Sequence, residues 1–197
     1  MKVSTDRISR NQLSTWHKTG PFPIDLLYRA RQNGKKTLEL HHKSVEEIQR
    51  ILAECLSEGK RFRAFGSLWS LNDIAVNNSR VHWNTDMDMR LGITPEYMYA
   101  SASISSDDLV FAQCGTTINQ LSSYLEQGKK SLIVSGGSNG QTIAGAISTG
   151  VHGGAFDKQC ISDYVKGIHL ITGPNDEDRI YLERKTEPIL NDSFGLS

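Results

Sequence analysis

The sequence has no excess charge of either sign, no long apolar run and only three cysteines. Its 197 residues carry 22 Lys or Arg and 22 Asp or Glu, which gives a formal net charge of zero. Proteins that bind nucleic acid draw much of their affinity from a basic surface, so this balance argues against that class. No segment approaches the roughly 20 apolar residues that cross a bilayer, so we expect no membrane span.

The cysteines and the N-terminus indicate the compartment. Cys55, Cys114 and Cys160 are widely separated and form no CxxC pair, so they indicate reduced thiols rather than a disulfide frame or a zinc site. Residues 1–10 are polar and lack the apolar core of a secretory signal. We therefore expect a cytoplasmic protein without a metal site.

The first recognisable unit has the order strand, helix, strand. Lys36–Leu40 is predicted as a strand, Ser44 as the cap of the following helix, and Arg61–Phe65 as the second strand. His41 and His42 precede the predicted cap and are expected to be solvated. This order predicts a β-α-β unit, in which the two strands run parallel.

A second unit of the same kind follows. The strand Leu109–Cys114 leads into a helix capped by Thr117 and ended by Gly128, and Ser131–Val134 is the predicted closing strand. Four further strands are predicted: Val81–Trp83, Tyr97–Ser101, and the hairpin of Gly167–Thr172 with Arg179–Glu183.

Together these elements predict an α+β fold with a β-α-β unit in each of two lobes. We expect residues 1–35 to form an extended N-terminal arm, residues 36–90 a first lobe and residues 91–197 a second lobe.

The least ordinary segment runs from Gly128 to Gly154 and holds eight of the seventeen glycines. Exposed backbone N–H groups of such a segment can converge on an anion. Ser131 to Phe156 contains no Lys or Arg, so a bound phosphate would be held by backbone and hydroxyl dipoles. A flexible glycine loop is the alternative, and neither the Walker loop nor the G-x-G-x-x-G fingerprint fits. The hydroxyl candidates are Ser135, Ser138, Thr142, Ser148 and Thr149.

One motif in this segment leaves a different function open. Gly136–Gly140 satisfies G-x-S-x-G, the nucleophile elbow of serine hydrolases, with Ser138 as nucleophile. His152 or His169 would then be the base, oriented by Asp157 or Asp163. Only 59 residues follow Ser138, which is short for the rest of such a fold, so a hydrolase is kept as an alternative.

Several ordered motifs carry a more specific resemblance. Ile143–Gly153 reads IAGAISTGVHG, Gly137–Thr142 precedes it as GSNGQT, and Arg63–Ser70 reads RAFGSLWS. Cys114–Thr117 and the Ser162-Asp163 pair before Gly167–Thr172 complete the order. This series resembles the flavin-binding signatures of the vanillyl-alcohol oxidase family, nearest to sugar, alditol and aldonolactone oxidases.

The resemblance implies a two-lobed, PCMH-type FAD-binding domain with FAD extended across both lobes. It assigns Gly137–Thr142 and Arg63–Ser70 to the pyrophosphate and the strand with Ile168 to the adenine. The implied cofactor-binding residues are Ala64, Phe65, Gly66, Ser67, Leu68, Trp69, Ser70, Gly137, Ser138, Asn139, Thr142, Gly145, Ser148, Thr149, His152 and Ile168.

Two departures from the family pattern concern the first phosphate loop. Its usual form is R-x-x-G-x-G-H-S, and here Leu68 stands for the second glycine and Trp69 for the histidine. Many relatives attach the flavin through that histidine, whereas an indole N–H is a donor without an available lone pair. We therefore expect a noncovalent flavin, with His152 as the one remaining nucleophile near the ring.

The resemblance also implies what the complete protein does. Family members carry a substrate domain after the flavin domain, so we expect the chain to be a fragment that is inactive alone. The full-length protein is expected to oxidise an alcohol, sugar alcohol or lactone by hydride transfer to FAD, with a base on the substrate domain. A non-catalytic flavin- or nucleotide-binding module remains a further alternative.

Overall fold

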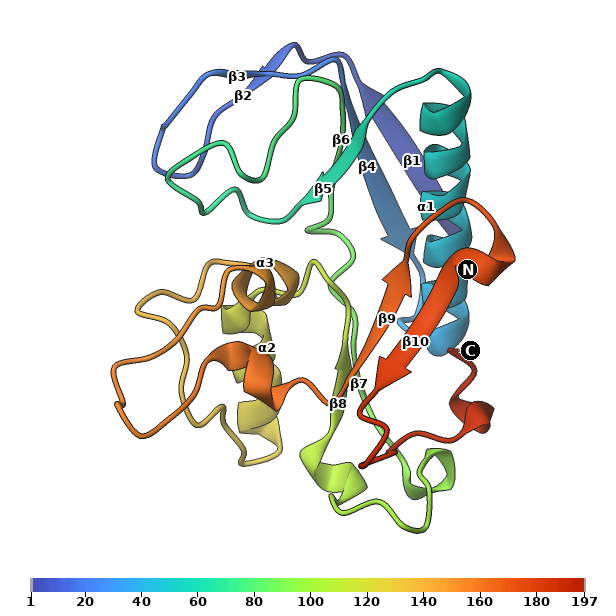
Figure 1. Cartoon of the computed structure of the whole chain (residues 1–197), viewed down its shortest axis with the longest axis vertical. Coiled ribbons are helices and arrows are strands. Elements are labelled where there is room, and N and C mark those ends of the chain that lie inside the picture. The colour runs from blue at the N-terminus through green and yellow to red at the C-terminus, as the bar shows by residue number, and fades with distance from the viewer. Residues whose placement is uncertain (1, 197) are drawn as a thin grey trace.

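A four-stranded mixed sheet in the order β1-β4-β6-β5 forms the upper part of the molecule in Figure 1. The structure is a computed structural model that describes residues 2–196. β1 (Lys2–Ile8) pairs antiparallel with β4 (Leu26–Asn33). β4 and β5 (Phe62–Phe65) each run parallel to β6 (Arg80–Trp83), which lies between them.

Both faces of this sheet are covered. α1 (Leu38–Ser57) joins β4 to β5, and its residues Ile48, Ile51 and Cys55 pack against Tyr28 of β4. Since side chains alternate between the faces of a strand, the neighbouring residues point away from α1. There Leu27, Phe65 and Val81 pack against Leu13 and Ile24 of the N-terminal segment.

The first β-α-β unit is present, but its leading strand and its helix cap lie earlier in the chain than predicted. Lys36–Leu40 is not a strand, because α1 begins at Leu38 and is capped by Thr37, whose side chain accepts from the Leu40 N–H. Ser44 is instead buried inside α1 and donates to the Leu40 carbonyl at 2.8 Å. The leading strand is β4, before the predicted one.

The first 35 residues do not form an extended arm. They supply β1 and β4, the two strands that carry seven residue pairs of the sheet, together with the short pair β2 (Gln12–Leu13) and β3 (Phe22–Pro23). The prediction failed because these strands find their partners through pairing across the chain, which local composition does not reveal.

The second unit is confirmed in its strand and helix. β8 (Val110–Ala112) pairs antiparallel with β7 (Arg90–Gly92) and leads into α2 (Ile118–Gln127). Thr117 and Gln120 form a capping box at the start of α2, and Gly128 ends it. The predicted closing strand Ser131–Val134 is wrong, since these residues pair with no strand in any sheet of the described part of the chain.

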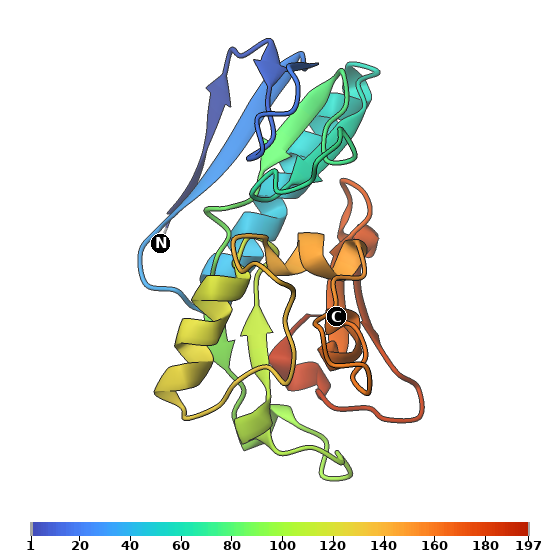
Figure 2. The ribbon, with the colours of Figure 1, turned by 90° about the vertical axis from the view of Figure 1, so that its left-hand side faces the viewer.

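The remaining elements complete an α+β chain. β9 (Gly167–Ile171) and β10 (Arg179–Glu183) form the predicted antiparallel hairpin. Ala146 of α3 (Ile143–Ser148) packs with Ile118 of α2 and with Ile161, and both helices lie below the sheet in Figures 1 and 2. Tyr97–Ser101 is not a strand, since Tyr97 is the last residue of a 3-10 helix and no strand follows it up to Ser101. The short 3-10 helices are η1 (Pro95–Tyr97), η2 (Ser106–Asp108), η3 (Ile161–Tyr164), η4 (Asp176–Asp178) and η5 (Asp192–Phe194).

Among the residues that the structure describes, no helix combines the length and apolar character needed to cross a membrane. The division into lobes near residue 90 stays a prediction.

Candidate functional site

Two loops far apart in the sequence meet below the sheet. We name residues 66–70, which follow β5, the first loop, and residues 135–142, which lead into α3, the second loop. A Cβ atom on Gly66 would overlap the Thr142 side chain, and one on Gly140 would overlap the Trp69 ring. Only glycine therefore allows the two backbones to approach this closely.

The second loop is fixed to the start of α2. The N–H groups of Ile118 and Asn119 donate to the carbonyls of Gln141 and Asn139, each at 2.9 Å. The Ile143 N–H donates in return to the Thr116 carbonyl at 2.7 Å. The first N–H groups of a helix have no hydrogen-bond acceptor within the helix. In α2, carbonyl groups of the second loop accept two of these hydrogen bonds. The backbone N–H groups of the loop itself are left over.

The unpaired backbone N–H groups of the two loops make the site a potential anion-binding site. Among the hydrogen bonds of residues 2–196, none has a backbone N–H of residues 66–70 or 135–142 as its donor. Consecutive unpaired N–H groups on a folded loop make a concavity that favours an anion. Two such stretches in contact can therefore hold an oxyanion with several negatively charged oxygens.

The hydroxyl groups of the same region are mostly engaged inside the protein. Ser138 donates to the Gln141 side chain at 3.1 Å, and Ser148 and Thr149 donate to the carbonyls of Ala144 and Gly145. Thr142 accepts from the Gly145 N–H as the cap of α3. The donors that remain for a ligand are therefore chiefly backbone N–H groups.

The first loop is held from its other side by the N-terminal segment, which the sequence did not point to. The Trp16 ring stacks on Trp69 with centroids 5.0 Å apart, and His17 meets the same ring edge-on. The backbone N–H of Trp16 donates to the Leu68 carbonyl at 2.7 Å. Trp69 is thus enclosed between Trp16 and the Gly140 backbone.

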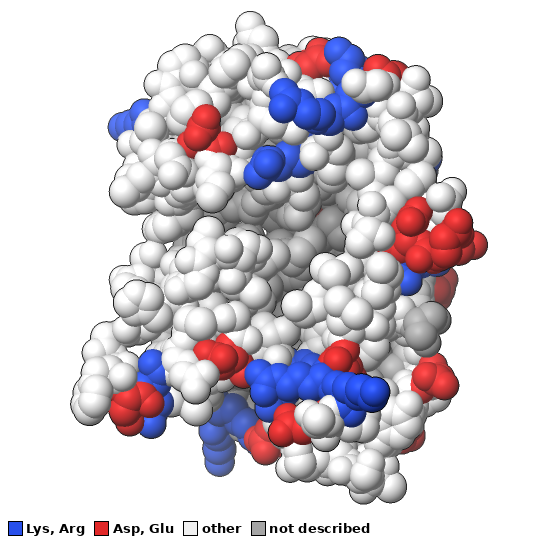
Figure 3. Space-filling view, viewed as in Figure 1, with Lys and Arg blue, Asp and Glu red and all other residues white. Residues whose placement is uncertain are grey.

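The two loops border a hollow in the molecular surface. Figure 3 shows this face hollowed between the sheet and the part that contains α2 and α3, with walls that are mostly uncharged and with Lys or Arg side chains above the rim. The absence of Lys and Arg from residues 131–156 agrees with the uncharged lower wall. Backbone dipoles, rather than ion pairs, would hold a ligand here.

The other residues predicted for the site lie around these loops. Phe65 is buried and stacks on Trp83, whereas Ala64, Gly137, Asn139 and Gly145 are exposed. His152 is exposed beyond α3, with its Nδ1 atom 3.0 Å from the Gly153 carbonyl. Ile168 lies on β9 with 39% of its surface exposed, and no described contact joins it to either loop.

The geometry of Ser138 does not match a hydrolase. The residues before Ser138 form no strand, so the strand-to-helix elbow is missing. The two candidate bases are engaged elsewhere, since His169 is bonded to His41 and His152 lies next to a backbone carbonyl. The serine-hydrolase alternative is therefore wrong.

Comparison with known sequences identifies relatives. The sequence model of the FAD binding domain family matches residues 39–177, a span that contains both loops. D-arabinono-1,4-lactone oxidase of Candida albicans is 26% identical over 141 residues, which are 68% of this chain and 25% of that protein. The same enzyme of Kluyveromyces lactis is 25% identical over 145 residues, 74% of this chain and 26% of that protein. The chain thus spans about a quarter of the length of these relatives.

Comparison with solved structures shows the fold. Cholesterol oxidase from B. sterolicum superposes with a TM-score of 0.62 at 13% identity, over 91% of this chain and 32% of that one. A solvent-stable cholesterol oxidase gives a TM-score of 0.58 at 16% identity, over 88% and 32% of the two chains.

Proposed function

The chain belongs to the FAD binding domain family, and from this premise we propose that the first and second loops together hold the pyrophosphate of FAD. The observation that carries the proposal is the contact between two loops whose backbone N–H groups have no partner among residues 2–196. Hydrogen bonds to a charged acceptor contribute roughly 1.5–3 kcal/mol each, so several of them suffice without a lysine.

The hollow between the sheet and the α2–α3 part, which both loops border, supports the proposal of an extended cofactor. We propose that these two parts act as two lobes, with FAD lying across both. Among the described residues β9 has only β10 as a strand neighbour, and we propose that the adenine lies along its other edge, near Ile168. His152 and the residues after α3 would then lie on the flavin side.

The bound flavin would supply a hydride acceptor, and this chain's part is to bind and orient it and to exclude water from it. The lactone oxidases among the relatives favour a substrate with an oxidisable hydroxyl carbon, such as a sugar lactone or alcohol. Because the chain spans about a quarter of those relatives, we propose that it does not turn over substrate on its own.

The test of the loops uses flavin fluorescence during titration of FAD with the protein. Gly66→Ala and Gly140→Ala each place a methyl group on the opposite loop and should weaken FAD binding by at least tenfold. Gly92→Ala is the matched control, since a Cβ there would lie 3.6 Å from the Tyr124 hydroxyl, an ordinary contact, and the residue lies in β7, outside both loops. Unchanged affinity in both loop variants, with circular dichroism like that of the control, would contradict the proposal.

We further propose that the flavin is held without a covalent bond. Trp69 replaces the histidine that attaches the flavin in many relatives, and the second loop offers no sulfur. Acid precipitation of the flavin-loaded protein should leave the yellow colour in the supernatant. Colour that stays with the pellet would show a covalent link, and mass spectrometry of a His152→Ala variant would tell whether His152 forms it.

A further inference from the structure

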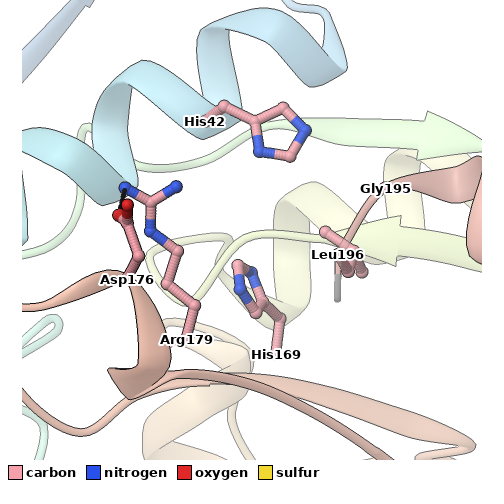
Figure 4. A pocket seen from close by; sticks show the side chains of 6 residues that line it. All are labelled: His42, His169, Asp176, Arg179, Gly195 and Leu196. Carbon is pink, nitrogen blue, oxygen red and sulfur yellow. Dashed lines mark ion pairs between the residues drawn. The ribbon is translucent and has the colours of Figure 1, made fainter.

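A separate cavity of about 230 Å³ lies between α1, the β9–β10 hairpin and the end of the described chain. Neither loop of the FAD site contributes to it. Figure 4 shows two imidazole rings and one guanidinium group arranged around the same space. Its lining residues are His42, His169, Asp176, Arg179, Gly195 and Leu196.

A chain of hydrogen bonds fixes where His169 carries its proton. The Gln113 Oε1 atom accepts from Gln32 at 2.9 Å and from the Met89 N–H at 3.1 Å, so its Nε2 must donate to His41 Nδ1. His41 then carries its proton on Nε2 and donates to His169 Nδ1 at 2.9 Å. His169 is therefore an Nε2–H donor.

Among the described residues, that donor has no acceptor. The His169 Nε2 atom is buried and has no hydrogen-bond partner among residues 2–196. Buried donors are rarely left unpaired, because the group has lost its hydrogen bonds to water. A ligand held against the wall of the cavity that this ring lines would supply an acceptor for the N–H.

Arg179 presents further donors to the same cavity. Its Nε atom donates to buried Gln49 at 2.7 Å, which fixes the guanidinium plane. One terminal nitrogen lies 3.0 Å from Asp176, whose side chain is 91% exposed. A guanidinium has five N–H donors, so others remain free. Such an exposed ion pair is weak, and Asp176 can swing into solvent.

We propose that this cavity binds a small oxyanion, such as a phosphate group, through Arg179, His169 and His42. Asp176 occupies Arg179 when the anion is absent and is displaced when it binds. A metal ion is a poorer occupant, since the described residues contain no group of three His, Cys, Asp or Glu side chains that could ligate one.

The proposal makes two opposite predictions for the thermal shift produced by inorganic phosphate at constant ionic strength. Arg179→Met should weaken the response at least tenfold in phosphate concentration, whereas Asp176→Asn should strengthen it several-fold because the competing carboxylate is gone. Arg184→Met and Asp157→Asn, which change the same charges at a different cavity, are the matched controls and should respond like the unaltered chain.

Glycerol phosphate, tested in parallel, distinguishes a phosphate ester from free phosphate as the preferred ligand. The exposed position of Asp176 means that its variant tests the site even where Arg179→Met fails to fold. Equal responses of Asp176→Asn and Asp157→Asn would overturn the proposal. FAD binding is measured separately, so failure of the FAD proposal does not affect this result.

Discussion

Leu68 holds a backbone conformation with φ +52°, which L-residues adopt only at a cost. The family motif that this loop resembles has glycine at the same position, where no Cβ is strained. The Leu68 side chain also packs partly against the core beside the sheet, which offsets part of that cost.

We predict that the Leu68→Gly variant is more stable to unfolding than Leu68→Ala by about 1 kcal/mol. At positions with ordinary backbone angles the alanine variant is the more stable of the two. Both variants lose the packing of the side chain, so the difference between them isolates the backbone strain. Urea unfolding measures it, and an alanine variant at least as stable as the glycine variant would show that position 68 is unstrained.

His82 is fully buried and its two ring nitrogens have fixed partners. Nδ1 lies 2.6 Å from Asn84 Oδ1, and Nε2 accepts from the Ala30 N–H at 3.2 Å. Burial lowers the pKa of His82 to about 4. The folded state thus favours the neutral ring, whereas the unfolded chain takes up a proton near pH 6.5.

Stability should therefore be fully present above about pH 6.5 and should fall as the pH drops toward 4, by about 1.4 kcal/mol per pH unit for this histidine. His41, whose pKa burial lowers to about 3, adds to the same loss. Urea unfolding at a series of pH values checks this. His82→Gln should show a shallower dependence than the unaltered chain, and an unchanged slope would contradict it.

At the scale of elements, α2 links helix capping to the site. Thr117 accepts from the Gln120 N–H and thereby fixes the first turn of α2, whose N–H groups bond to the second loop. Thr117→Ala should cost about 1 kcal/mol in the free energy of unfolding and should also weaken FAD binding. Thr117→Ser keeps the oxygen and should restore both. A loss of stability in Thr117→Ala without any change in FAD affinity would show that the helix cap does not position the second loop.

The elements that could be predicted from the sequence are those with local chemistry. The capping box at Thr117, the turn at Gly128 and the β9–β10 hairpin all follow from residues close together in the chain. The start of α1 was misplaced because Thr37 and Ser44 are both capable caps. β1 and β4 were missed because each depends on a distant partner.

At the scale of the whole molecule, the sequence motifs located both loops but not their contact. Gly66 and Thr142, or Trp69 and Gly140, are more than seventy residues apart, and only the fold brings them together. Trp16 and His17 could not be predicted at all, since they precede the family match and belong to no motif. The same holds for the cavity of His42, His169 and Arg179, which joins three separate elements.

We propose that unpaired backbone N–H groups of both loops hold the pyrophosphate of FAD. Hydrogen–deuterium exchange of the chain with and without FAD reports on these N–H groups themselves. We predict that FAD slows exchange in residues 66–70 and 135–142 together, and leaves the segments with His42 and Arg179 unchanged. Saturating FAD with no added protection in either loop would contradict the account.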